Sequence, residues 1–266
     1  MKIIFINILL CLMSALGFAQ SPVLNQSAFT HGEEITYKVY YNWKFVWVPT
    51  GEVTFLTTET DSTYELKVEG LSYPSYDSMF KVRDNYISRI DKRTMKPIDF
   101  RRDIEEGSYI RYDSLNFDHA QLTVEEFFGK SKQEAEYFKF DTKENVLDMV
   151  SAIYLVRGMD FDNIEAPVDI PFNIFFDKEL LELDIRYKGV EKRKLKTVGK
   201  VRSLHLQADL LAGNIFKKGD VMDIWVSDDG NNIPLQVESP IRYGMIKAVL
   251  KSVKGSKFSF DFEITD

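Results

Sequence analysis

The sequence predicts a mainly β protein in which a strongly curved antiparallel sheet, similar to an open barrel, wraps around one central helix. Segments of alternating polar and apolar residues recur along the chain, with Gly- or Pro-containing turns between them. The sequence is rich in aromatic residues, with 20 Phe and 13 Tyr, and residues of this type favour strands. One apolar segment with helix-capping residues interrupts the pattern near the middle of the chain.

The alternating segments begin with Glu34–Tyr40 and Thr63–Glu69. Further segments of this kind span residues 52–56, 98–104, 134–140, 180–187, 201–210 and 246–253. Alternation gives each strand one buried and one wet face, which is typical of antiparallel sheets. Turns are expected at residues 49–51, 106–108, 218–220 and 229–230.

The central helix is predicted at about residues 146–157. Asn145 is a good N-cap, and Asp148 three residues later nearly completes a capping box. Arg157 suits the negative end of the helix dipole, and Gly158 is a plausible stop. Apolar residues occupy almost every side of this helix, which predicts that the sheet buries it.

The segment 1–19 is predicted to be a signal peptide. Lys2 precedes a short apolar run, and Gly17 and Ala19 place small residues where a signal peptidase cleaves, before Gln20. We therefore expect a soluble exported protein of the periplasm or outer envelope. Lipid attachment at Cys11 is the weaker alternative, because Leu10 stands where a small residue is needed.

The mature chain is expected to be a flexible arm at residues 20–30 followed by a single β-rich domain at residues 31–266. The only cysteine of the sequence, Cys11, lies in the predicted signal peptide, so the mature chain is expected to have no disulfide or thiolate site. The formal net charge of −7 disfavours nucleic-acid binding. No other apolar run reaches the roughly 20 residues of a membrane-spanning helix, so no transmembrane segment is expected in the mature chain.

Signatures of catalysis are missing from the sequence. The histidines, His31, His119 and His205, are far apart, and neither a nucleophile elbow nor a phosphate-binding loop occurs. We therefore predict no catalytic residue, no metal site, no cofactor and no enzyme activity. The acidic segment 228–232 looks superficially like a calcium loop, but its spacing fails that pattern and a hairpin turn is favoured.

A basic stretch lies at residues 186–202, with eight Lys or Arg and one acidic residue, Glu191. It fits either a site for an anionic headgroup or polysaccharide, or a solvated hairpin whose lysines discourage edge pairing. The hairpin is the favoured interpretation.

Aromatic residues supply the candidate ligand site. Most of them are expected to fill the core, but a cupped sheet can leave a cavity large enough for a ligand. The candidate ligand-binding residues are Trp43, Trp47, Tyr154, Phe172, Phe175 and Phe176. The polar helix residues Asp148, Ser151 and Arg157 are expected to serve in capping and buried hydrogen bonds.

Several motifs, in this order, resemble a known family. They are Gly32-Glu33 with Ile35 and Tyr37, the helix pattern Asp148, Val150, Ser151, Tyr154 and Arg157, the run Trp225–Asp229 with Pro234, and Gly244 with Ile246. Together they resemble the exported bacterial family called domain of unknown function 3108. The resemblance implies an envelope protein with an antiparallel, helix-containing fold, and it implies no reaction. A looser, fold-level similarity links such sheets to LolA-like periplasmic lipoprotein carriers.

These observations favour a binding or carrier module of the envelope. Its partner would be a lipid, another amphiphile or an envelope polymer, and its protein partners are open. The first alternative is a structural or interaction protein with a filled core. The second is a glycan-acting enzyme with two carboxyl groups roughly 5 to 9.5 Å apart in a cleft.

Overall fold

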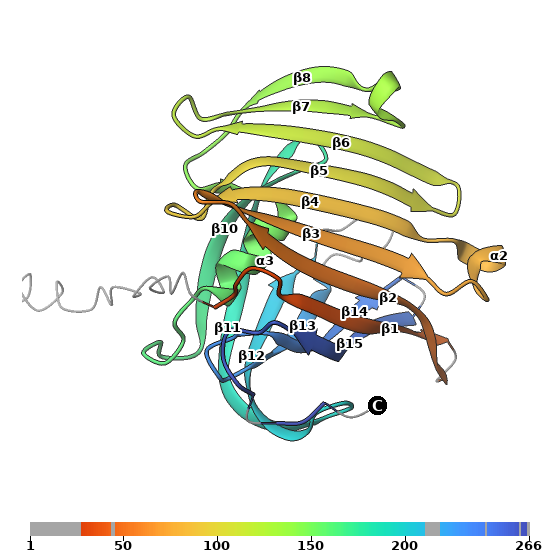
Figure 1. The fold of residues 1–266 in the computed structure, drawn as a ribbon, viewed down its shortest axis with the longest axis vertical. Coiled ribbons are helices and arrows are strands. Elements are labelled where there is room, and N and C mark those ends of the chain that lie inside the picture. The colour runs from red at the N-terminus through yellow and green to blue at the C-terminus, as the bar shows by residue number, and fades with distance from the viewer. Residues whose placement is uncertain (1–27, 44–45, 211–218, 243, 261, 265–266) are drawn as a thin grey trace, which may run out of the picture.

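The computed structural model describes residues 28–43, 46–210, 219–242, 244–260 and 262–264 (Figure 1). Within these residues fifteen strands form one sheet, in the order β8-β7-β6-β5-β4-β3-β2-β1-β15-β14-β13-β12-β11-β10-β9. The predicted mainly β class is confirmed.

The first eight strands form a meander that runs from β1 to one end of the sheet. They are β1 (Glu34–Trp43), β2 (Val46–Glu59), β3 (Thr63–Ser72), β4 (Arg83–Asp91), β5 (Pro97–Glu106), β6 (Tyr109–Asp118), β7 (Thr123–Gly129) and β8 (Glu136–Asp141). A short helix α2 (Asp77–Phe80) lies between β3 and β4, and a 3-10 turn η1 (Lys132–Glu134) precedes β8.

The remaining strands lie on the other side of β1; the first of them precedes the central helix, and the last six form a second meander. They are β9 (Val146–Leu147), β10 (Val168–Phe176), β11 (Glu179–Leu195), β12 (Gly199–Asp209), β13 (Val221–Ser227), β14 (Pro234–Ile241) and β15 (Gly244–Lys254). β15 pairs with β1, so the two meanders join into one sheet. Among the described strands all pairs are antiparallel except β9 with β10.

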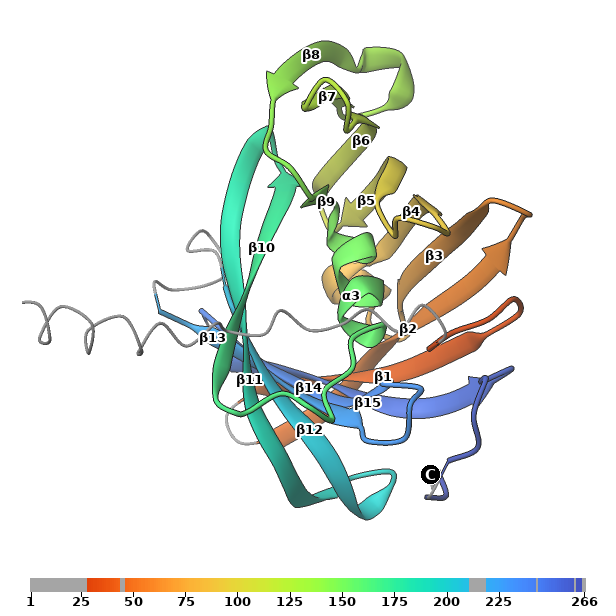
Figure 2. The ribbon, with the colours of Figure 1, turned by 90° about the vertical axis from the view of Figure 1, so that its left-hand side faces the viewer.

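The helix α3 (Met149–Arg157) lies inside the curve of the sheet, as predicted (Figure 2). Its first turn differs from the prediction. Asp148, rather than Asn145, is the N-cap, and it forms a capping box with Ser151. Asn145 has a left-handed φ of 56°, because Val146 and Leu147 pair with β10 before the helix begins.

Two further predictions need correction. In the predicted flexible arm, residues 20–27 lie outside the described residues, but Ala28 and Phe29 are 1% and 2% exposed and pack in the core. The ring of Phe29 meets the rings of Tyr64 and Tyr154 edge-on at 5.0 and 4.9 Å. The predicted turn at residues 49–51 is instead an irregularity within β2, where the register with β1 shifts.

The buried apolar residues form three clusters, two of which include residues of α3. The first joins α3 to β3–β7 and β10, the second joins α3 to β10–β13, and the third lies between β1 and the β11–β15 strands. The hairpin of β11 and β12, predicted from the basic stretch, contributes Leu195 and Val198 to the third cluster. The helix is therefore enclosed by apolar side chains on most sides, as its composition predicts.

Candidate functional site

The polar residues of the helix form a buried network. Arg157 donates to both carboxylate oxygens of Glu33, at 2.7 and 3.0 Å, and also to the backbone oxygens of Asn231 and Ala28. The side chains of Arg157 and Glu33 are 3% and 0% exposed. Burial alone lowers the pKa of Arg157, but the hydrogen bonds and charge of Glu33 raise it, so the guanidinium stays charged.

Two more helix side chains bind the first meander. Asp148 caps α3 and accepts a hydrogen bond of 2.7 Å from the hydroxyl of Ser88 on β4. The Tyr154 hydroxyl lies 3.0 Å from the Thr57 hydroxyl on β2. Burial raises the pKa of both Asp148 and Tyr154. These contacts support the structural role expected for the polar residues of the helix.

The described side chains among the six aromatic residues predicted to bind a ligand lie in several parts of the structure. Tyr154 and Phe175 share the first cluster, and Phe172 lies in the second. Trp47 is half-buried on β2 beneath the ammonium of Lys247, 4.4 Å from its ring centre. Trp43 ends β1, and its side chain lies outside the described part of the structure.

The remaining aromatic residue, Phe176, lies where the two ends of the sheet meet. The described strands place β8 at one end of the sheet and β9 with β10 at the other. Side chains bridge these ends, which we call the seam: the Phe140 and Phe175 rings pack at 5.2 Å, and Lys143 pairs with Glu182. In Figure 2 the chain runs from β8, at the top, directly down to the short strand β9 beside β10.

The turn between β10 and β11 places two charged side chains, those of Asp177 and Lys178, at the seam. Asp177 and Lys178 both have left-handed φ angles, as a two-residue hairpin turn requires. The carboxylate of Asp177 pairs with Arg102 on β5, and Arg102 also pairs with Asp113 on β6. Arg102 lies 4.4 Å above the ring centre of Phe176. We call Arg102, Asp113, Glu126, Asp177 and Lys178 the seam cluster.

Glu126 is the unusual member of the seam cluster. It is 0% exposed on the inner face of β7, and neither carboxylate oxygen has a hydrogen-bond partner. Oδ1 of Asp113 is likewise buried without a partner. Burial, and then the charge of Asp113, raise the pKa of Glu126 to about 7, against the opposing charges of Lys178 and Arg102.

Lys178 lies on the two aromatic rings that flank Glu126. Phe138 is the cross-strand partner of Glu126, and Phe128 lies two residues further along the same face of β7. The Lys178 ammonium is 3.6 Å from the Phe138 ring centre and 4.1 Å from that of Phe128. This geometry is typical of cation–π contacts.

Sequence reasoning missed the seam cluster, although a signal for it exists. Arg102 lies two residues from both Phe100 and Ile104, and Glu126 lies two residues from both Val124 and Phe128. Residues two apart share one face of a strand, so each charge occupies an inward position. A charge at an inward position must find partners or shift its pKa. Which inward charges meet across the seam depends on the curvature of the whole sheet.

A second carboxyl pair lies near the α2 end of the sheet. Burial, and then the charge of Glu106, raise the pKa of Asp84 to about 7. The surface beside it is apolar: Met79 and Phe80 of α2 are 78% and 56% exposed, and Ile110 is 52% exposed. The backbone nitrogen of Gly107 donates to the oxygen of Lys81, which holds α2 beside the β5–β6 turn.

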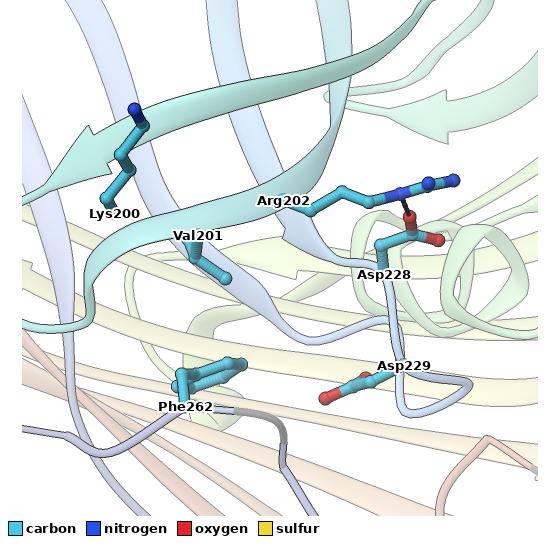
Figure 3. A pocket seen from close by; sticks show the side chains of 6 residues that line it. All are labelled: Lys200, Val201, Arg202, Asp228, Asp229 and Phe262. Atoms are coloured by element: carbon cyan, nitrogen blue, oxygen red, sulfur yellow. Dashed lines mark hydrogen bonds and ion pairs between the residues drawn. The ribbon is translucent and has the colours of Figure 1, made fainter.

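The acidic turn at residues 228–232 joins β13 and β14, as predicted, and closes a small hollow. This hollow measures about 180 Å³ and is lined by Lys200, Val201, Arg202, Asp228, Asp229 and Phe262 (Figure 3). Arg202 pairs with Asp228, and Asp229 accepts hydrogen bonds from Ser227 and from the backbone of Asn231. Asp229 therefore stabilises the turn from within, as in a hairpin turn. The asparagines tie the turn to its surroundings: Asn231 bonds to the backbone of Phe258, and Asn232 donates to the backbone oxygens of Arg157 and Met159.

The three histidines stay apart and each has a local partner. His31 accepts from the backbone of Glu59, His119 donates to the oxygen of Pro97, and His205 lies 2.8 Å from Asp223. Over the described ranges, no group of three or more His, Cys, Asp or Glu residues is arranged to hold a metal ion. Nor does any helix there have the length and apolar character needed to cross a membrane.

Comparison with known proteins adds a family and a fold. The family described as "Protein of unknown function (DUF3108)" matches residues 36–251. A crystal structure of a beta-barrel-like protein of domain of unknown function DUF1849 from Brucella abortus is similar, with a TM-score of 0.59 and 8% identity. The match covers 86% of this chain and all of the other. No curated protein matches the chain.

Proposed function

This chain belongs to the DUF3108 family of proteins of unknown function, and we propose that it is a non-catalytic binding or carrier module for an amphiphilic ligand. The observation that carries the proposal is the seam, where the two end strands of the described sheet are not paired by a strand ladder and are joined only by the connection at residues 142–145 and by side-chain contacts. Separating side-chain contacts is expected to cost less free energy than breaking a ladder of backbone hydrogen bonds. The beta-barrel-like neighbour is compatible with such a module.

The chemistry of the seam favours an amphiphile over a purely apolar ligand. Phe140 and Phe175 offer an apolar lining, and the charged seam cluster lies beside them. In the ligand-free state these groups fill the space themselves. Binding would therefore require the β10–β11 turn to move, with the ligand tail taking the place of contacts between the rings.

The cellular setting belongs to the same proposal. With the predicted signal peptide at residues 1–19, outside the described residues, the protein would act in the periplasm or outer envelope. No cofactor takes part in the proposed role. A function similar to that of LolA-like lipoprotein carriers stays a prediction.

Native mass spectrometry of the mature protein, purified from the envelope of its producer and then extracted with solvent, tests this function. A reproducible extra mass released as a lipid or other amphiphile is the expected result. A bare polypeptide mass, together with no binding of added amphiphiles, would overturn it.

The exposed apolar surface at α2 favours a second candidate, an interaction protein with a filled core. Met79, Phe80 and Ile110 lie together at one end of the sheet, and exposed apolar groups of this kind often mark docking surfaces. Cross-linking in the native envelope, compared between wild type and Met79→Ser/Phe80→Ser, separates the candidates. A protein adduct lost only in the variant supports docking.

A further inference from the structure

We propose that the seam cluster is a binding site for the ammonium group of an amphiphile, and that Lys178 of the same chain occupies part of this site when no ligand is bound. This inference rests on the proposed binding function and specifies the ligand's head group.

The first argument is the surplus of buried acceptors. Arg102 is already shared between Asp113 and Asp177, so it does not satisfy Glu126. Both oxygens of Glu126 and one of Asp113 remain buried without a hydrogen-bond partner. Buried polar groups are rarely left unpaired, and a carboxylate is among the most costly to leave so. A donor with positive charge would satisfy them.

The second argument is the aromatic surroundings. The rings of Phe128 and Phe138 flank Glu126 and already bind one ammonium, that of Lys178. Phe128 also receives the guanidinium of Arg111 at 4.0 Å. Aromatic faces beside a carboxylate are the usual chemistry of ammonium recognition. Yet Lys178 forms no ion pair within 4.0 Å among the described residues, so it lies on the rings without reaching Glu126.

The third argument concerns access. Lys178 belongs to a two-residue turn at the end of a hairpin, and Asp177 beside it is about half exposed. Movement of this turn would remove Lys178 from the rings and open the way to Glu126. The charges that face Glu126 are Asp113 and Arg102 from the inner face of the sheet, and Lys178 and Asp177 from the turn.

The test uses decylammonium chloride, whose head group carries N–H donors, below its micelle concentration, with decanoate and decanol as controls of equal tail length. Binding to the mature protein is measured by titration calorimetry at pH 6 and pH 8. Because Glu126, with a pKa of about 7, must ionise to pair with the ammonium, we expect about tenfold tighter binding at pH 8. Buffers of different ionisation enthalpy should reveal proton release on binding at pH 6.

Three variants sharpen the result. Glu126→Gln should weaken binding of the ammonium and abolish its pH dependence, whereas Lys178→Ala should strengthen binding by removing the internal competitor. Glu125→Gln, on the opposite face of the same strand and paired with Lys139, is the matched control and should bind as wild type does. Thermal unfolding of each variant confirms that it is folded.

The outcomes separate this inference from the proposed function. Decanoate or decanol binding as tightly as decylammonium would support the binding module and overturn the ammonium site. Tight ammonium binding that is unchanged in Glu126→Gln would also overturn it. Binding of none of the three amphiphiles would count against the proposed function itself.

Discussion

Arg157 at the end of α3 binds both carboxylate oxygens of Glu33, 124 positions away in the sequence, at 2.7 and 3.0 Å. The pair joins the central helix to the start of the sheet. Both side chains are almost fully buried, so neither charge can turn to solvent if its partner is removed.

We therefore expect Arg157→Met to lower the free energy of unfolding by about 3–5 kcal/mol, because it leaves Glu33 buried and uncompensated. The double variant Glu33→Met/Arg157→Met should recover part of this loss. Recovery should be incomplete, since the backbone oxygens of Asn231 and Ala28 also lose their donor. Urea unfolding measures all three proteins.

The exposed pair of Lys254 and Glu34 provides the control. Its side chains are 70% and 36% exposed, so Lys254→Ala should change stability by less than about 1 kcal/mol. An equal effect of Arg157→Met and Lys254→Ala would show that the buried pair does not hold the helix in place.

A second prediction concerns the cap of α3. Asp148 accepts hydrogen bonds from the backbone nitrogens of Val150 and Ser151 and from the hydroxyl of Ser88. Asp148→Ala removes all three, and we expect a loss of about 2 kcal/mol. Hydrogen exchange should accelerate at the amides of Val150 and Ser151 before other helix amides. Unchanged exchange there would exclude the capping role.

The difference between the predicted and observed cap shows what local sequence can tell. Asn145 and Asp148 are both good N-caps by residue type. The choice falls on Asp148 because Val146 and Leu147 pair with β10, and β10 lies more than twenty residues further along the chain. Alternation predicts most strands because each has one face buried inside the curved sheet and one face exposed, a pattern that its own sequence carries.

The candidate site was harder to predict for the same reason. Phe172, Phe175 and Phe176 were chosen by type, and the alternation of β10 could not say which of them reach the seam. Phe175 meets Phe140 and Phe176 meets Arg102 only because the curvature of fifteen described strands brings the two ends of the sheet together. Curvature is a property of the whole sheet, and the sequence of a single strand does not predict it.

A third prediction tests whether the seam contributes to stability. Phe175 is 1% exposed between the first cluster and Phe140, so Phe175→Ala should cost about 3–5 kcal/mol through lost packing and a new cavity. Phe127→Ala is the control, because Phe127 is 39% exposed on the outer face of β7 and should cost far less. Thermal or urea unfolding distinguishes them. Equal losses would mean that the seam is already loose in the folded protein.

The last prediction follows from the protonation of Glu126. Its pKa is about 7 in the folded protein and about 4.5 when the chain is unfolded, so the folded state holds this proton more tightly. The resulting stabilisation is fully present below about pH 4.5 and is lost as the pH rises through 7. The shift corresponds to about 3 kcal/mol, at about 1.4 kcal/mol for each pH unit.

Glu126→Gln cannot titrate and should therefore not show this loss. The difference in unfolding free energy, variant minus wild type, should grow in favour of the variant by up to about 3 kcal/mol between pH 4 and pH 8. Asp84 also has a pKa raised to about 7, but it titrates alike in both proteins and cancels in the difference. The variant Glu125→Gln should instead follow the wild-type curve. If the Glu126→Gln and wild-type curves ran parallel, Glu126 would be ionised in the folded protein, and the proton release expected on ammonium binding would disappear with it.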